Sequence, residues 1–162
     1  MSLSAATEKK PAAATRVLTL TLGRELYALS VLNVREIIRP LDISPVPRSP
    51  AGLLGVINLR GKIVPVLDLR IKFGLEFTGR TERTCIVVVQ TGKAPHHKLT
   101  GLMVDEVQEV LTLNPNDIED APTFGTIVDV GYLRGLAKVK DAVMILLDLE
   151  RMLSNTKLEP VP

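Results

Sequence analysis

Residues 28–38 read ALSVLNVREII, and residues 101–111 read GLMVDEVQEVL. The two stretches place apolar and acidic residues at matching positions, so that Val34 corresponds to Val107 with an offset of 107 − 34 = 73. Each stretch alternates or clusters apolar residues over short runs, which is typical of β-strands. The repetition predicts that a small β unit occurs twice in the chain.

Two further repeated segments support this interpretation. Residues 59–61 (LRG) return as residues 133–135, at an offset of 133 − 59 = 74. Residues 66–69 (VLDL) return as residues 146–149 (LLDL), with Leu147 at an offset of 147 − 67 = 80. A unit repeated only twice at this length indicates paired subdomains rather than a solenoid, whose repeats are shorter and more numerous.

The composition favours a β-rich core and excludes several classes of protein. Of 162 residues, 46 % are hydrophobic but only 3 % are aromatic, so the core must consist of Val, Ile and Leu. β-Branched side chains fit pleated surfaces. The single cysteine, Cys85, excludes an intramolecular disulfide and fits a reducing compartment. No run approaches the roughly 18 apolar residues of a membrane span. We therefore expect a soluble, cytoplasmic protein without direct membrane insertion.

The pattern of strands predicts the domain organisation. Residues 1–15 should form a disordered arm. Five strands are expected in each half, at residues 16–22, 26–31, 34–38, 52–59 and 62–69, and at residues 83–90, 99–104, 107–111, 132–139 and 143–147. A short helix is expected over residues 148–154, with Asp148 as its cap. We predict an all-β fold of two five-stranded barrels, the first subdomain spanning residues 16–82 and the second residues 83–147.

The residues that carry chemistry in enzymes are sparse. His96 and His97 are adjacent, so on an extended segment they point to opposite sides and share a metal poorly. Asp68 and Asp148 each end an apolar strand, where a carboxylate more often caps a turn or helix than acts as an acid or base. Three Phe and two Tyr offer no stacking platform for nucleic acid. We expect no catalytic residue, no metal and no cofactor, and so a binding or scaffold module.

Residues 49–70, SPAGLLGVINLRGKIVPVLDLR, resemble the CheW family of chemotaxis coupling proteins. The resemblance continues through residues 22–28, 34–37 and 101–107 and covers roughly residues 17–153. It implies two five-stranded SH3-like barrels around a shared apolar seam. It also implies a non-enzymatic adaptor that couples the cytoplasmic tips of chemoreceptors to the regulatory domain of the histidine kinase CheA, in membrane receptor arrays.

The resemblance assigns a receptor-binding surface to Val34, Glu36, Arg60 and Val110. Independently of the family, Arg60 precedes Gly61 at a strand reversal, where a long side chain projects outward. A planar guanidinium can bridge carboxylate and carbonyl groups. Glu36 is the natural candidate to hold it. The ordinary alternatives are a surface ion pair for Glu36 and Arg60 and core positions for the two valines.

For the kinase, the resemblance indicates Ile43, Val46 and Leu54 in the first subdomain. Phe124 lies where family members contact a second kinase domain in the array. Two other functions remain open at this point. One is an adaptor for a CheA-type pathway of pili or development, and the other is a double barrel that binds a small molecule.

Overall fold

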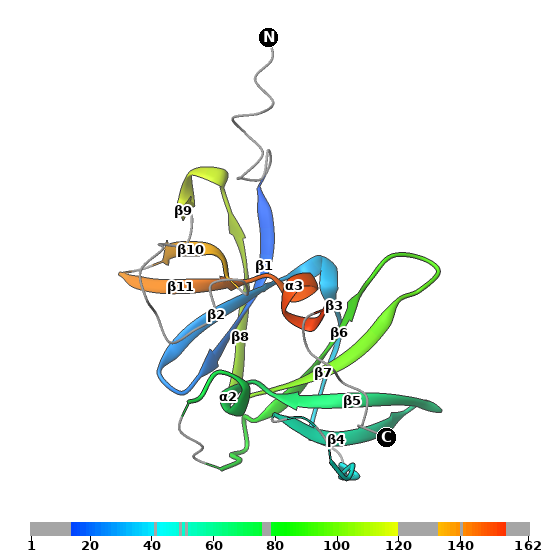
Figure 1. Ribbon diagram of the computed structural model, residues 1–162. Helices are drawn as coiled ribbons and strands as arrows, with labels where there is room; N and C mark the ends of the chain where they lie inside the picture. Colours follow the sequence, from blue (N-terminus) through cyan, green and yellow to red (C-terminus); the bar gives the residue numbers. More distant parts are fainter. Residues whose placement is uncertain are drawn as a thin grey trace.

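The computed structural model describes residues 14–40, 42–48, 50, 52–75, 79–119, 133–139 and 141–154. Its strands form two sheets that lie beside each other (Figure 1). One sheet has six strands and the other has five. The all-β fold of two small units, expected from the repeat, is confirmed.

The first sheet, called barrel A below, has the strand order β8-β1-β2-β11-β10-β9. Its strands are β1 (Thr15–Leu22), β2 (Glu25–Ser30), β8 (Glu106–Leu113), β9 (Ile118–Glu119), β10 (Leu133–Val139) and β11 (Ala142–Leu147). The second sheet, called barrel B, has the order β3-β6-β7-β5-β4. Its strands are β3 (Val34–Ile38), β4 (Leu53–Leu59), β5 (Lys62–Asp68), β6 (Cys85–Thr91) and β7 (Lys98–Val104).

The helical elements are short and sit at junctions between strands. They are the 3-10 turns η1 (Val31–Asn33) and η2 (Pro115–Asp117) and the helices α2 (Leu69–Lys72) and α3 (Leu149–Ser154). The expected C-terminal helix corresponds to α3, whereas α2 was not predicted. None of the helices in the described ranges is long and apolar enough to cross a membrane.

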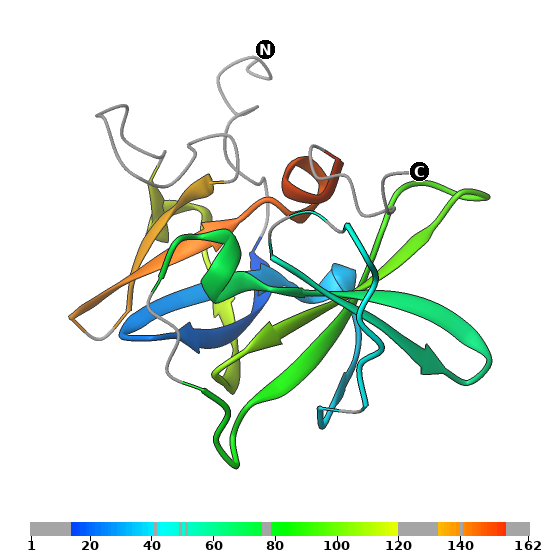
Figure 2. The same ribbon diagram turned by 60° about the horizontal axis from the view of Figure 1, so that its bottom comes forward.

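The two barrels do not correspond to the two halves of the chain. Barrel A combines β1 and β2 of the first half with β8, β9, β10 and β11 of the second. Barrel B combines β3, β4 and β5 with β6 and β7. The predicted division into residues 16–82 and 83–147 is therefore wrong as a description of the barrels. The chain changes barrels after β2 and again after β7, so each half gives two strands to the other's sheet (Figure 2).

The strand registers correct one part of the predicted repeat. Residues 53–55 (LLG) pair with β5 through a bulge, and residues 133–135 (LRG) pair with β11 through the same bulge. Their offset is 135 − 55 = 80, which agrees with the offset between residues 67 and 147. Residues 133–135 are thus the counterpart of residues 53–55, and their likeness to residues 59–61 is coincidental.

Two equivalent glycines allow the chain to close each barrel. After β3, Ser44 returns to pair with Val56 of β4, and after β8, Glu119 of β9 pairs with β10. A Cβ on Gly55 would lie 2.2 Å from the Ser44 carbonyl oxygen, and one on Gly135 would lie 2.6 Å from the Glu119 carbonyl oxygen. No side chain fits at such distances, so only glycine permits the closing contact.

The hydrophobic core has a small cluster inside each barrel and a larger one between them. The shared cluster takes buried residues from both sheets and from α3, among them Leu20, Leu29, Val87, Leu102 and Met152. Burying each such side chain contributes about 1.5–3 kcal/mol. Because the largest cluster lies between the sheets, neither barrel has a complete core by itself.

Candidate functional site

A groove of about 320 Å³ opens on barrel B between β3 and the turn that joins β4 to β5. Four apolar residues line it, Val34, Leu59, Val88 and Leu99, together with four charged residues, Arg35, Glu36, Arg60 and Lys62. Three of the residues that the sequence analysis assigned to a receptor-binding surface, Val34, Glu36 and Arg60, therefore meet in one place.

A bulge in β3 orients the first two of these residues. Val34 pairs with Val89 and Glu36 pairs with Val88, so Arg35 is an extra residue between them. Residues paired across strands share a face of the sheet, and consecutive residues of β6 point to opposite faces. Val34 is half-buried: it packs against the shared core and also lines the groove. The bulge places Glu36 on the Val88 side of the sheet, where the groove lies.

The turn between β4 and β5 positions Arg60. Both Arg60 and Gly61 have positive φ, 52° and 85°. Two-residue hairpin turns of this kind match the twist of the strands that they join. The Asn58 side-chain oxygen accepts a hydrogen bond from the Gly61 N–H at 2.9 Å, which holds the turn.

Arg60 and Glu36 form the ion pair that the sequence predicted. Arg60 Nη1 donates to Glu36 Oε2 at 2.6 Å. This hydrogen bond, together with the carboxylate charge, raises the pKa of the Arg60 guanidinium. The Arg60 side chain is 74 % exposed and that of Glu36 24 %, so the remaining guanidinium donors face solvent. Glu36 Oε1 is buried and has no hydrogen-bond donor among the described residues.

The charges around the groove are unequal. Arg35, Arg60 and Lys62 line it together with a single carboxylate, Glu36. Complementary charge steers and orients a partner more than it raises affinity. The groove can therefore bind a partner that presents apolar side chains beside acidic ones.

The fourth predicted receptor-binding residue, Val110, does not line this groove. It lies on β8 of barrel A, paired with Leu18 of β1, and is 45 % exposed. Its counterpart in the repeat is Ile37, which is also 45 % exposed on β3. The structure thus places Val110 on the other barrel from Val34, Glu36 and Arg60.

The residues assigned to the kinase lie on β4 of barrel B and on the segment that follows β3. Ile43 and Leu54 are partly buried against its internal cluster. Val46 follows the Ser44 bridge and is half-buried. Phe124, assigned to an array contact, lies outside the described residues.

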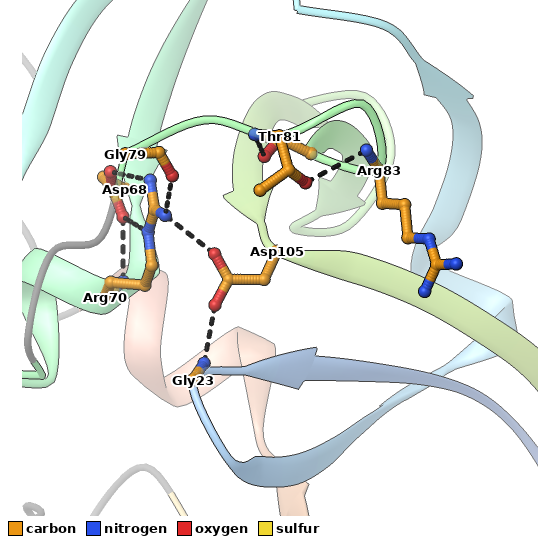
Figure 3. A network of polar contacts seen from close by, with 8 residues as sticks. Gly23, Asp68, Arg70, Gly79, Thr81, Arg83 and Asp105 are labelled. Carbon is orange, nitrogen blue, oxygen red and sulfur yellow. Dashed lines mark hydrogen bonds and ion pairs between the residues drawn. The ribbon is translucent and has the colours of Figure 1, made fainter.

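Sequence reasoning missed a buried ionic junction centred on Arg70 (Figure 3). The Arg70 guanidinium donates to both carboxylate oxygens of Asp68, at 3.1 and 3.0 Å. It also donates to Asp105 Oδ1 at 2.7 Å and to the Gly79 carbonyl oxygen at 2.9 Å. The second Asp105 oxygen accepts from the Gly23 N–H at 2.6 Å. Arg70 therefore connects α2 with the β7–β8 crossover and the β1–β2 turn.

Burial and charge oppose each other at Arg70. The side chains of Arg70 and Asp68 are fully buried. Desolvation acts to lower the pKa of the guanidinium, but the hydrogen bonds and charges of Asp68 and Asp105 outweigh it and raise the pKa. Asp68 also caps α2 by accepting from the Arg70 N–H at 2.9 Å, and Asp148 accepts from the Arg151 N–H at 3.1 Å. The prediction that both strand-end aspartates act as caps is confirmed. No signal in the sequence indicated that Arg70 is buried.

No group of three or more potential metal-binding side chains occurs within the described ranges. His96 and His97 are exposed in the turn between β6 and β7.

Comparison with known proteins identifies the group to which this arrangement is similar. A family model, the CheW-like domain, matches residues 16–157. The chain is 36 % identical over 141 residues to the chemotaxis protein CheW of Klebsiella aerogenes, covering 87 % of this chain and 82 % of that protein. It is 33 % identical over 135 residues to the chemotaxis protein CheW of Helicobacter pylori, covering 83 % and 78 %. The crystal structure of the scaffolding protein TtCheW from Thermoanaerobacter tengcongensis matches with a TM-score of 0.79 and 33 % identity, over 90 % of this chain and 97 % of that one.

Proposed function

The chain belongs to the family of CheW-like domains, and on this premise we propose that it couples chemoreceptors to the histidine kinase CheA in chemotaxis. It is an adaptor or scaffold of the chemotaxis system rather than an enzyme. In this proposal it acts in the cytoplasm and is recruited to receptor arrays at the membrane.

The groove on barrel B is the observation that carries the receptor half of the proposal. It combines partly buried apolar side chains with an exposed arginine, which is held in place by Glu36. An amphipathic helix recognises such a groove by placing apolar side chains along it and polar ones at its margins. We assign the receptor tip to this groove, with Val34, Glu36 and Arg60 as contacts, and Val110 to a second contact on β8.

A second apolar surface of barrel B, formed by Ile43, Val46 and Leu54, supports the kinase half. Ile43, Val46 and Leu54 are apolar and only partly buried, so each leaves apolar surface that a partner can cover. None of these three residues lines the receptor groove, which allows one chain to contact two partners at once. Phe124 is assigned to a further kinase contact.

The test is a charge reversal with a closely matched control. Arg60→Glu should lower receptor-stimulated kinase activity at least tenfold in membranes reconstituted with receptor, CheA and the variant. Arg83→Glu is the control, because Arg83 is also 74 % exposed and also forms a single surface ion pair, with Glu106 at 3.4 Å. The control should retain activity within twofold of the parent protein.

Two further measurements separate loss of coupling from loss of structure. The melting temperature of Arg60→Glu should stay close to that of the control, because surface substitutions rarely change stability much. Calorimetric titration with the CheA regulatory domain should show unchanged affinity. Normal receptor-stimulated activity of the Arg60 variant would refute the assignment of the groove.

A further inference from the structure

The internal repeat makes two junctions of the molecule comparable. In barrel A, β11 pairs with β2 in the same way as β5 pairs with β7 in barrel B. Ala28 therefore corresponds to Gly101, at an offset of 101 − 28 = 73, and Val66 corresponds to Leu146, at an offset of 146 − 66 = 80. Under these offsets Asp105 corresponds to Leu32 and Arg70 corresponds to Glu150. The Arg70 junction beside α2 is therefore matched by a second junction beside α3.

Each junction binds the backbone N–H of a glycine, Gly23 in the first and Gly92 in the second, but the acceptor differs. In the first, the N–H of Gly23, in the β1–β2 turn, donates to Asp105, which also binds Arg70. In the second, the N–H of Gly92, after β6, donates to Glu150 Oε1 at 3.0 Å. Glu150 of α3 accepts this hydrogen bond directly. No carboxylate is therefore needed at position 32, which corresponds to Asp105 in the crossover between the barrels.

The side chain at that crossover position, that of Leu32, is exposed to solvent. Its side chain is 94 % exposed, the highest value among the exposed large hydrophobic residues of the described ranges. Its neighbour Asn33 supplies the local polar contacts, donating to the Gln90 carbonyl oxygen at 3.0 Å and to Glu150 Oε2 at 3.4 Å. Replacing a side chain this exposed should change the stability of the fold little.

Leu32 lies at a groove of about 340 Å³, called the Leu32 groove below. Apolar surface there comes from Leu32, Leu147 and Leu149, and charge comes from Arg134, Asp148 and Glu150. Two carboxylates against one guanidinium leave the groove acidic. At the matching junction, a guanidinium occupies the space between Asp68, the counterpart of Asp148, and the crossover residue.

We propose that the Leu32 groove binds a segment of a partner protein that presents an arginine next to an apolar residue. The apolar side chain covers Leu32, and the guanidinium pairs with Asp148 and Glu150. The internal Arg70 junction is the precedent for this pairing, because the same fold there pairs a guanidinium with Asp68, the counterpart of Asp148. The site is distinct from the groove of Arg60 and does not depend on the function proposed for that groove.

The test uses nuclear magnetic resonance of the full chain with two five-residue peptides. One peptide has arginine at its centre between two leucines, and the other has glutamate in place of the arginine. The arginine peptide should shift the amide signals of Asn33, Gly92 and Glu150 in a saturable way, at least tenfold more strongly than the glutamate peptide. The effect should weaken as salt is added, because partly exposed charges are screened.

Variants identify the residues responsible. Leu32→Asp should abolish the saturable shifts and should fold normally, since the residue is almost fully exposed. Ile63→Asp is the control, because Ile63 is the next most exposed large apolar residue at 68 % and does not line the groove. The proposal is overturned if the two peptides shift the same signals equally, if neither gives saturable shifts, or if Leu32→Asp binds as the parent does.

Discussion

Replacing Arg70 by methionine should destabilise the whole molecule, because the substitution leaves buried carboxylate charge without its partner. Methionine keeps much of the length of the apolar stem but removes two hydrogen bonds to Asp68, one to Asp105 and one to the Gly79 carbonyl oxygen. Asp68 is fully buried, whereas the side chain of Asp105 is 22 % exposed and can be partly hydrated.

The size of the effect follows from this geometry. Removing one member of a buried ion pair costs about 3–5 kcal/mol, mostly because the other charge is left unpaired. In a domain of this size, each kcal/mol lowers the melting temperature by about 2–4 °C, so we expect a decrease of about 6–20 °C. Urea denaturation followed by circular dichroism, together with calorimetry, would measure both quantities.

Arg83→Met is the matched control, since Arg83 lies near the same junction (Figure 3). Its side chain forms an exposed ion pair with Glu106. Its free energy of unfolding should change by no more than about 0.5 kcal/mol. Adding Asp68→Asn to Arg70→Met should cost less than the sum of the two single changes, because the unpaired charge is then gone. If Arg70→Met were no more harmful than Arg83→Met, the junction would not be holding the barrels together.

Three further predictions concern binding and titration. Val46→Asp should weaken binding to the CheA regulatory domain, measured by calorimetry, at least tenfold because it buries an unpaired charge. The control Val143→Asp, at an exposed position of barrel A, should bind as the parent does. Equal affinities of the two variants would discard the proposed kinase surface. Burial and then the charge of Glu25 raise the pKa of Tyr27 from 10.0 to about 12, so the stability contributed by its neutral phenol is present below pH 10 and lost between pH 10 and 12. Over that range the parent should lose about 2–3 kcal/mol more than Tyr27→Phe in denaturation experiments, and parallel curves would contradict this. Burial raises the pKa of the Cys85 thiol. Alkylation of Cys85 by iodoacetamide at pH 8.5, followed by mass spectrometry, should therefore be at least several-fold slower in the folded protein than in urea. Equal rates would show that the thiol is accessible and ionised in the folded protein.

Much of the candidate site was predictable from local patterns. The residues around Arg60 form a strand, a tight turn and a second strand, and this arrangement depends on neighbours within the segment. The contact between Glu36 and Arg60 was inferred because both occur at recognisable positions of a long motif, and the structure contains it at 2.6 Å. Val110 was assigned to the same surface, but its distance from the groove depends on how the two barrels pack.

The sequence by itself determined the strands, the turns, the caps and the family of this protein, because alternation, glycine positions and capping aspartates act over a few residues. The tertiary structure alone decided which strands share a barrel, since hydrogen bonds between β1 and β8, or β3 and β6, join segments that no local pattern relates. It also decided that Arg70 is buried while Arg60 is exposed. Both are arginines at the end of an apolar strand. Arg70 forms a buried structural ion pair because α2, the β7–β8 crossover and the β1–β2 turn pack around it. Nothing packs around Arg60 in this way among the described residues, so its ion pair stays exposed.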